Sequence, residues 1–138
     1  MIIVEITPYS KTEDKIKKIR YEVFVRGQNV PEGIEIDGLD PDCTHVLLSV
    51  NGKPVGTGRI QNDGHIGRVA VLEEFRGKGF GTMIIKKLEE AAKDKKLRSV
   101  YLNSQSHAEL FYKRLGYRPV GETFMEAGIQ HVKMLKDI

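Results

Sequence analysis

The chain has 138 residues, of which 30% are charged, and its formal net charge is +3. A chain of this length forms one domain with a core large enough to do without disulfide or metal staples. The small net charge does not indicate a nucleic-acid partner, and no apolar run reaches the roughly 18 residues that a membrane-spanning helix requires. Cys43 is the only cysteine, which excludes an internal disulfide, and no base motif marks it as a catalytic thiol. We expect a cytosolic protein without a signal peptide.

The N-terminal half predicts a strand, a helix and three further strands. Residues 2–7 alternate as in a strand, and apolar side chains recur at helical spacing over residues 12–26. A polar, acid-rich loop follows over residues 28–44. Two hairpin turns, Asn51-Gly52 and Asn62-Asp63-Gly64, then separate three strands that we expect to be antiparallel. These three strands cover residues 45–50, 54–61 and 65–72.

The C-terminal half predicts two helices and three strands. One helix begins near Phe80 with a single apolar stripe, and another over residues 108–115 ends at Gly116. The strands are expected at residues 98–103, 117–124 and 129–135. The order β-α-β-β-β-α-β-α-β-β indicates a mixed α/β fold. It is one domain over residues 1–138, with a central, mostly antiparallel sheet of about seven strands flanked by helices.

A glycine-rich turn, Arg76-Gly77-Lys78-Gly79-Phe80-Gly81, joins a predicted strand to the helix at Phe80. A turn that opens a helix presents unpaired backbone N–H groups at the positive end of the helix dipole. Glycine tolerates positive φ and has no Cβ to hold a phosphate away, while Arg76 and Lys78 add positive charge. The turn therefore predicts a pyrophosphate site, with a plain surface loop as the alternative.

The spacing of the glycines narrows the choice of ligand. A Walker A loop requires Gly-Lys-Ser/Thr, and a dinucleotide fingerprint requires G-x-G-x-x-G with an acidic residue about 20 positions later; neither occurs here. The pattern R-x-x-G-x-G at a strand-to-helix junction resembles the acetyl-coenzyme A loop of the GNAT N-acetyltransferase superfamily. Phe111 to Tyr117 resembles a second motif of this family, F/L-Y-x-x-x-G-F/Y. Three more segments resemble a subgroup of small bacterial acetyltransferases: Val23 to Gln28, Glu35 to Asp40 and Gly128 to Met134.

The resemblance implies a GNAT-like fold and a site for acetyl-coenzyme A (acetyl-CoA). In the family the fourth strand splays from the fifth, and pantetheine pairs with the exposed edge of the fourth. The implied pantetheine contacts are backbone groups of Val69, Ala70 and Val71, with an N–H near Val71 facing the thioester oxygen. The implied pyrophosphate contacts are Arg76, Gly77, Lys78, Gly79, Phe80, Gly81 and Thr82. Asn103, Gln105 and Phe111 are implied around pantetheine and the acyl group, although many relatives carry Asn where this chain has Gln105.

The resemblance also implies catalytic roles. Tyr112, in the second motif, is the candidate to protonate the departing thiolate, and packing between helix and sheet is its alternative role. An attacking amine must lose a proton, directly or through water. The candidate bases or acceptor contacts are Glu35, Glu126 and His131, for which solvated or structural roles are the alternative.

The acid-rich loop gives an indication of the charge of the acceptor. Asp37 and Asp40 accompany Glu35 in the loop that borders the acceptor cleft in this fold. These acids suggest a cationic acceptor, such as a polyamine, an aminoglycoside-like compound or a lysine side chain. Among the other histidines, we expect structural roles for His45 and His65, and we expect His107 near a helix N-cap.

These observations predict an enzyme that transfers acetyl from acetyl-CoA to a primary amine of a small molecule or peptide. A thioester is already activated, so direct attack without a covalent enzyme intermediate is expected. We expect no metal, because the histidines lack paired ligand spacing. We also expect no nucleic-acid or membrane partner. The final strands could pair across a homodimer. The alternative is a non-catalytic acyl-CoA sensor or a protein-interaction module on the same fold. A domain that binds ATP through the loop is disfavoured by the missing Lys-Ser/Thr.

Overall fold

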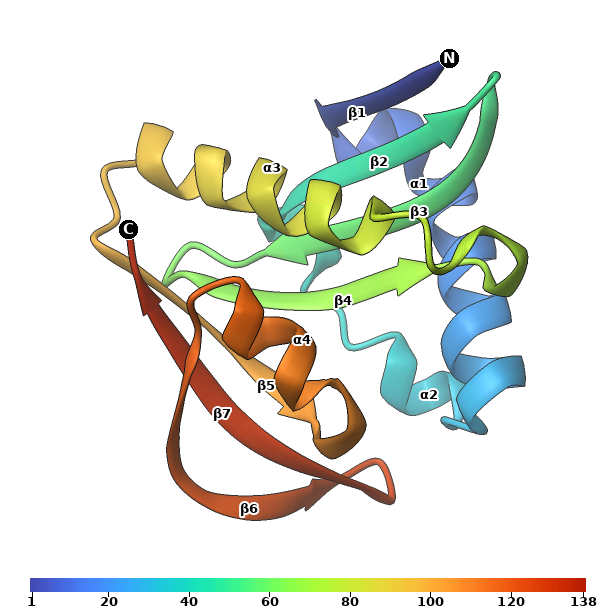
Figure 1. Ribbon diagram of the computed structural model, residues 1–138. Coiled ribbons are helices and arrows are strands. Elements are labelled where there is room, and N and C mark those ends of the chain that lie inside the picture. The colour runs from blue at the N-terminus through green and yellow to red at the C-terminus, as the bar shows by residue number, and fades with distance from the viewer.

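The computed structural model describes residues 1–138 and contains one seven-stranded sheet. Its strands are β1 (Ile2–Thr7), β2 (Thr44–Val50), β3 (Lys53–Ile60), β4 (His65–Val71), β5 (Ser99–Gln105), β6 (Arg118–Glu126) and β7 (Ile129–Asp137). They lie in the order β1-β2-β3-β4-β5-β7-β6, and every neighbouring pair is antiparallel except β4 and β5 (Figure 1). The predicted mixed α/β fold with a mostly antiparallel sheet is confirmed.

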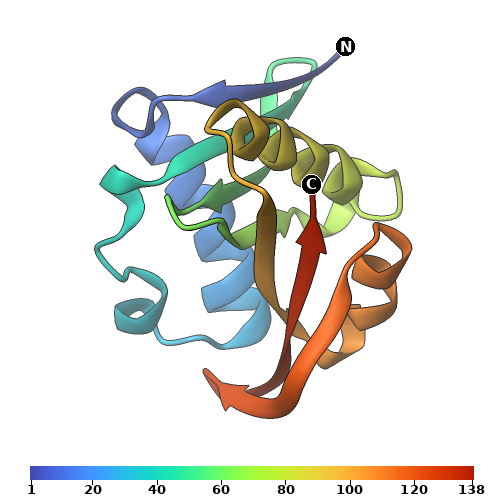
Figure 2. The ribbon, with the colours of Figure 1, turned by 90° about the vertical axis from the view of Figure 1, so that its left-hand side faces the viewer.

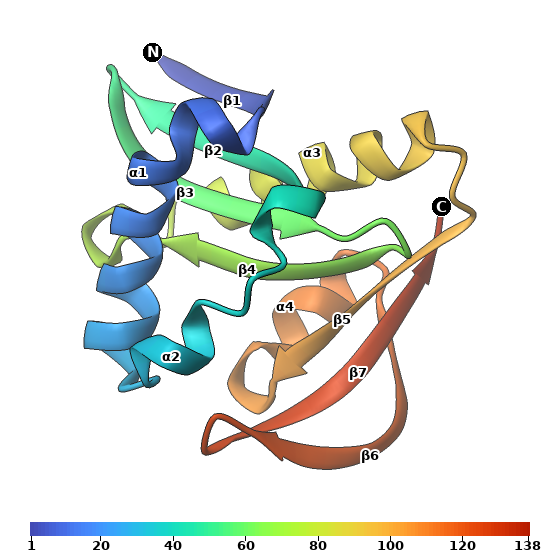
Figure 3. The ribbon, with the colours of Figure 1, turned by 180° about the vertical axis from the view of Figure 1, so that it is seen from behind.

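Helices cover both faces of the sheet. They are α1 (Tyr9–Arg20), α2 (Glu32–Glu35), α3 (Phe80–Asp94) and α4 (Glu109–Arg114). α3 and α4 lie on one face, and α1 and α2 lie on the other, as opposite views show (Figures 1 and 3). Gly56 and Gly58 of β3 permit the close approach of α3, because a Cβ at either would lie 2.8 Å from a side-chain atom of Ile84. None of these helices is long and apolar enough to span a membrane.

The first helix is longer than the predicted 12–26 and changes its type. It begins at Tyr9, directly after Pro8 in extended conformation, and at Tyr21–Arg26 it continues as a π-helical turn. Turns of this kind are rare and frequently lie at functional sites. The predicted acidic loop is not wholly irregular, since it contains α2 and a 3₁₀ turn at Asp40–Asp42.

β4 and β5 pair briefly and then diverge. The paired positions are His65 with Tyr101 and Ile66 with Leu102. Beyond them β4 carries a bulge around Arg68, where it has one residue more than β3 between their paired positions. A bulge bends its strand and increases the local twist. Figure 2 shows β5 and β7, in brown and red, running steeply across the direction of β1 and β2. The fourth strand is therefore splayed from the fifth.

Candidate active site

A cavity of about 650 Å³ lies where β4 and β5 diverge. Its lining comes from the π-helical turn, β3, β4, the glycine-rich turn, β5, the start of α4 and the β6–β7 hairpin. Segments from both faces of the sheet thus meet at one opening. Because β5 leaves β4 after Ile66, the edge of β4 beyond this residue has backbone N–H and C=O groups with no strand partner on that side.

The glycine-rich turn has open space beside it and unpaired N–H groups at the start of α3. Gly77 and Gly79 have φ of 76° and 82°, and a Cβ at either position would meet no atom within 4 Å, so the space beside the turn is open. The Met83 N–H donates to Gly79 O and starts the α3 ladder, which leaves the three preceding N–H groups without a helical acceptor. The Nε of Arg76 donates to Val71 O at 2.9 Å, and this bond holds the guanidinium at the turn.

Most of the residues predicted to contact acetyl-CoA line this cavity. From the turn these are Arg76, Gly77, Gly79, Phe80, Gly81 and Thr82. From β4, β5 and α4 these are Val69, Ala70, Val71, Asn103, Gln105 and Phe111. Lys78 is the exception: it does not line the cavity, and its ammonium lies 5.8 Å from the centroid of the Phe75 ring.

Gln105 has a partner that the sequence did not indicate. Its amide and that of Gln28 exchange two hydrogen bonds, of 2.8 and 3.2 Å, over 77 residues of chain. Both residues line the cavity. The pair ties the end of β5 to the segment that follows the π-helical turn, and so links the two sides of the cavity.

Comparisons with known proteins agree with this geometry. The sequence profile of the family described as acetyltransferase (GNAT) domain matches residues 9–138. The chain belongs to this family. The uncharacterized N-acetyltransferase YjcF of Bacillus subtilis is 42% identical over 93% of this chain and 96% of its own. The crystal structure of an acyl-CoA N-acyltransferase from Pseudomonas aeruginosa has a TM-score of 0.88 at 29% identity, over 99% of both chains. A GNAT acetyltransferase from Elizabethkingia anophelis, with acetyl-CoA bound, shares the fold (TM-score 0.72, 17% identity, 99% of this chain and 98% of that one).

Tyr112 is one of the residues that line this GNAT cavity. Its ring packs edge-on against Phe111 and Tyr117, with centroid distances of 5.0 and 5.8 Å, and its hydroxyl makes no hydrogen bond to the protein. Burial raises the pKa of Tyr112 to about 12, so the phenol keeps its proton at neutral pH. It is a weak acid toward an ordinary thiolate, whose conjugate pKa is about 8.5. The hydroxyl is therefore suited to donate a hydrogen bond to a departing sulfur.

Of the three candidate bases, Glu126 and His131 lie together at the cavity. His131 Nδ1 lies 2.7 Å from Ile129 O, and since a carbonyl only accepts, Nδ1 carries the proton. The other ring nitrogen, Nε2, is then free to accept a proton, and it lies 3.6 Å from Glu126 Oε2. The imidazole and the carboxylate are therefore neighbours at the cavity wall. The pair has the composition of a base and its supporting acid.

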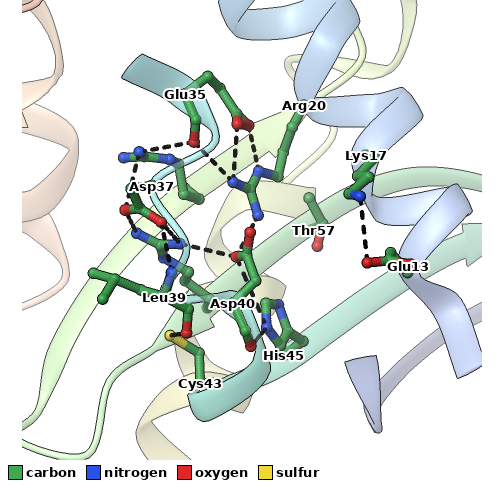
Figure 4. A network of polar contacts seen from close by, with 12 residues as sticks. Glu13, Lys17, Arg20, Glu35, Asp37, Leu39, Asp40, Cys43, His45 and Thr57 are labelled. Carbon is green, nitrogen blue, oxygen red and sulfur yellow. Dashed lines mark hydrogen bonds and ion pairs between the residues drawn. The ribbon is translucent and has the colours of Figure 1, made fainter. Parts of the chain in front are cut away.

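Glu35 is different, and its prediction as a base or acceptor contact is wrong. It is buried, it does not line the cavity, and both carboxylate oxygens accept hydrogen bonds from Arg20 (Figure 4). Both oxygens of this carboxylate are engaged by a buried guanidinium and neither reaches the cavity. Glu35 therefore belongs to the interior of the protein.

The other acids of this segment are paired in the same way. Asp40 accepts from Arg20 at 2.6 Å and from Arg59 at 2.8 Å, and Asp37 accepts from Arg59 (Figure 4). Burial by itself would raise the pKa values of both aspartates, but hydrogen bonds from the arginines outweigh it and hold them below the usual range. The inference of a cationic acceptor from these acids is wrong, because arginines that are distant in sequence neutralise them.

The histidines divide between structure and site. His45 is buried, donates from Nε2 to Asp40 O at 2.8 Å and stacks on Tyr9, as a structural residue does. His65 stacks on Tyr101 and its Nδ1 lies 3.2 Å from Gln61 Nε2, contacts that fit the structural role expected of it, and it also lines the cavity. Burial lowers its pKa, so this imidazole is neutral at pH 7. His107 lies in the turn before α4, as expected, and also reaches the cavity.

Two arginines at the cavity were missed from the sequence. Arg59 and Arg68 interrupt otherwise apolar strands, and this interruption was the signal that could have found them. Arg68 has φ of 51°, which is rare for a residue other than glycine and occurs here at the β4 bulge. Burial, followed by the nearby charge of Arg59, lowers the pKa of Arg68. A partly desolvated cation thus lies next to the strand edge that faces the cavity.

Proposed function

We propose that this GNAT protein transfers an acetyl group from acetyl-CoA to an amine by direct attack. The observation that carries the proposal is the single cavity at the β4–β5 splay. It joins an unpaired strand edge, a glycine-rich helix start and the Tyr112 hydroxyl. A GNAT neighbour of the same fold has acetyl-CoA bound, which supports this choice of donor. The amine acceptor is a small molecule or a peptide.

Different groups of the chain would bind different parts of acetyl-CoA. The pyrophosphate would accept hydrogen bonds from the N–H groups at the start of α3 and from Arg76. The pantetheine amides would pair with the free edge of β4 at Val69 and Val71. An N–H of this edge would donate to the thioester oxygen as it becomes an oxyanion.

Proton transfers complete the reaction. An alkylamine with a pKa near 10.4 is almost wholly protonated at pH 7, and His131 Nε2 is the group that would accept its proton, directly or through water. The amine nitrogen then attacks the thioester carbon, and the C–S bond breaks as the tetrahedral intermediate collapses. Tyr112 would donate a hydrogen bond to the departing sulfur. Coenzyme A gains its net proton from the attacking nitrogen, which is strongly acidic once it has bonded to carbon.

Calorimetric titration of acetyl-CoA into the purified protein tests the donor site. We expect micromolar binding that is weakened in an Arg76→Ala/Gly79→Ala double variant. Thiol release with a panel of amines then separates an enzyme from the alternative, a non-catalytic acyl-CoA sensor. A folded wild type that binds no acetyl-CoA would overturn the proposal, and binding without any turnover would favour the sensor.

A homodimer through the last strands stays a prediction. β6 is an edge strand, and all nine of its residues are exposed. An unpaired edge is a ready template for pairing with a second copy. Sedimentation at several concentrations would measure the association.

A further inference from the structure

Three arginines, at positions 59, 68 and 76, and one acid, Glu126, line the cavity. Behind the lining, Asp37 pairs with Arg59 and Arg68, and Asp40 pairs with Arg59. Arg76 belongs to the glycine-rich turn, so it is assigned to the donor's phosphates. Arg59 and Arg68 lie elsewhere, on β3 and β4, and no group of the donor accounts for them.

The guanidinium of Arg68 makes hydrogen bonds to the protein through one of its three nitrogens only. Every hydrogen bond that it donates leaves from Nη2, to Ile34 O at 3.4 Å, Glu35 O at 3.1 Å and Asp37 Oδ2 at 3.3 Å. Its Nε is buried with no partner, and its Nη1 makes no hydrogen bond to the protein. The side chain is 27% exposed. The guanidinium is therefore held in place through Nη2, and Nη1 is its unpaired donor group that is not buried.

Arg59 adds a second unsatisfied donor. Its side chain is 4% exposed, Asp37 and Asp40 occupy its two Nη groups, and its Nε is buried without a partner. Buried donors without acceptors are rare in folded proteins and each calls for an explanation. Two of the three buried side-chain nitrogens that lack a partner belong to these adjacent arginines, and both arginines line the cavity.

The backbone of β4 also has an unusual conformation at Arg68. The residue has a left-handed φ of 51° within a strand, at the bulge that ends the pairing of β4 with β5. Strain of this kind persists only where the surrounding structure enforces it, and it clusters at functional sites. Bulges next to active sites redirect a side chain, and here that side chain is a cation.

We propose that the acceptor is an amino carboxylate, such as a free amino acid, whose carboxylate binds to the free guanidinium donors of Arg68 with Arg59 behind it. This inference rests on the proposed function. Arg68 lies three residues before Val71, whose N–H is assigned to the thioester oxygen. A strand rises about 3.3 Å per residue, so the two backbone positions lie about 10 Å apart, a distance that the Arg68 side chain and a small amino acid can span together. Carboxylates are the anions whose planar geometry matches a guanidinium.

The test uses matched acceptors and thiol release. Each standard amino acid is offered to the wild type as the free acid and as its amide, and kcat/KM is calculated from the concentration of neutral amine, because the two amines differ in pKa. We expect kcat/KM at least tenfold higher for the best free acid than for its amide. Arg68→Gln should raise the KM of that acid by 10-fold or more and leave acetyl-CoA affinity within twofold. Arg68→Lys should restore part of the loss, and Arg98→Gln, at an exposed arginine that does not line the cavity, should change neither constant.

The outcomes separate this inference from the proposed function. Equal or faster turnover of the amides would overturn the amino carboxylate and leave the acetyltransferase intact. Turnover of other amines without turnover of any free acid would do the same. Failure to bind acetyl-CoA would overturn the proposed function, and this inference with it. The comparison of acid and amide needs only the wild type, so it decides the question even where a variant at Arg68 fails to fold.

Discussion

The glycine-rich turn over residues 76–82 and the acidic segment over residues 28–44 both look like parts of a site in the sequence. The turn lies at the cavity with open space beside it, whereas Glu35 and Asp40 of the acidic segment are buried against arginines. A turn acts through its own backbone, which local residues control. A charge acts through its partners, and the acids of this segment pair with arginines 15 to 31 residues away. The role of a turn that acts through its backbone can thus be inferred from neighbouring residues. The role of a charged side chain cannot, because it depends on partners that are distant in sequence.

The largest effect is expected from breaking the ion pairs of the acidic segment. Asp40→Asn removes the charge that Arg20 and Arg59 share, which leaves two buried guanidinium groups undercompensated. We expect the free energy of unfolding, measured with urea, to fall by about 3–5 kcal/mol. Asp42→Asn, at an exposed acid two residues away with no ion pair, should stay within about 0.5 kcal/mol of the wild type. Equal stabilities of the two variants would mean that the segment is an ordinary acidic surface.

On the cavity side, Tyr112→Phe removes only the hydroxyl and should affect turnover but not folding. The loss of a donor to the departing sulfur is expected to lower kcat about 100-fold and leave acetyl-CoA affinity within twofold. Tyr21→Phe, at an exposed tyrosine, is the control. Full activity of Tyr112→Phe on a good acceptor would show that this tyrosine only packs against its aromatic neighbours.

Gly79 of the glycine-rich turn and Gly33 of the acidic segment allow the same substitution to be compared in both regions. Gly79 has φ of 82°, so Gly79→Ala imposes a left-handed conformation on a residue with a Cβ, at about 1–2 kcal/mol. We expect the dissociation constant for acetyl-CoA to rise about tenfold, as measured by calorimetry. Gly33→Ala meets no atom within 4 Å and needs no positive φ, so it should leave binding unchanged. The same loss in both variants would contradict a specific role for the turn.

The smallest effect is a dependence of stability on pH. Burial lowers the pKa of His45, and its buried Nδ1 has no acceptor for a second proton. Its contribution is thus complete above the unfolded value of about 6.5 and is lost as the pH falls toward the folded value. His65 acts in the same direction. Asp37 and Asp40, whose pKa values are also lowered, add a steeper loss below about pH 4.

Urea unfolding at a series of pH values measures this profile. The free energy of unfolding should be level above pH 7, decline gently below about 6.5 and fall steeply below about 4. His45→Gln should make the gentle part shallower and leave the steep part in place. A level profile from pH 7 to 5 in the wild type would contradict the neutral, buried state of His45.

The sequence predicted the donor side of the cavity more completely than the acceptor side. Gly77 and Gly79 mark the donor side because a glycine pattern at a strand-to-helix junction is a short, local signal. His131 and Glu126 were found as single residues, but their pairing across a hairpin turn was not. Arg68 was missed altogether, because a bulge in β4 is set by the register of β3 and not by β4 alone. The Gln28–Gln105 pair was missed because it joins residues 77 positions apart.

By itself the sequence determined the order of helices and strands, the glycine-rich turn and the family, since periodicity and short motifs are properties of neighbouring residues. The tertiary structure decided which strands diverge, which acids are neutralised and which cations face the cavity. The physical reason is that burial and ionic pairing depend on contacts between distant segments. Glu35 is a surface acid when only its neighbours are considered, and it becomes a buried partner of Arg20 when the chain folds.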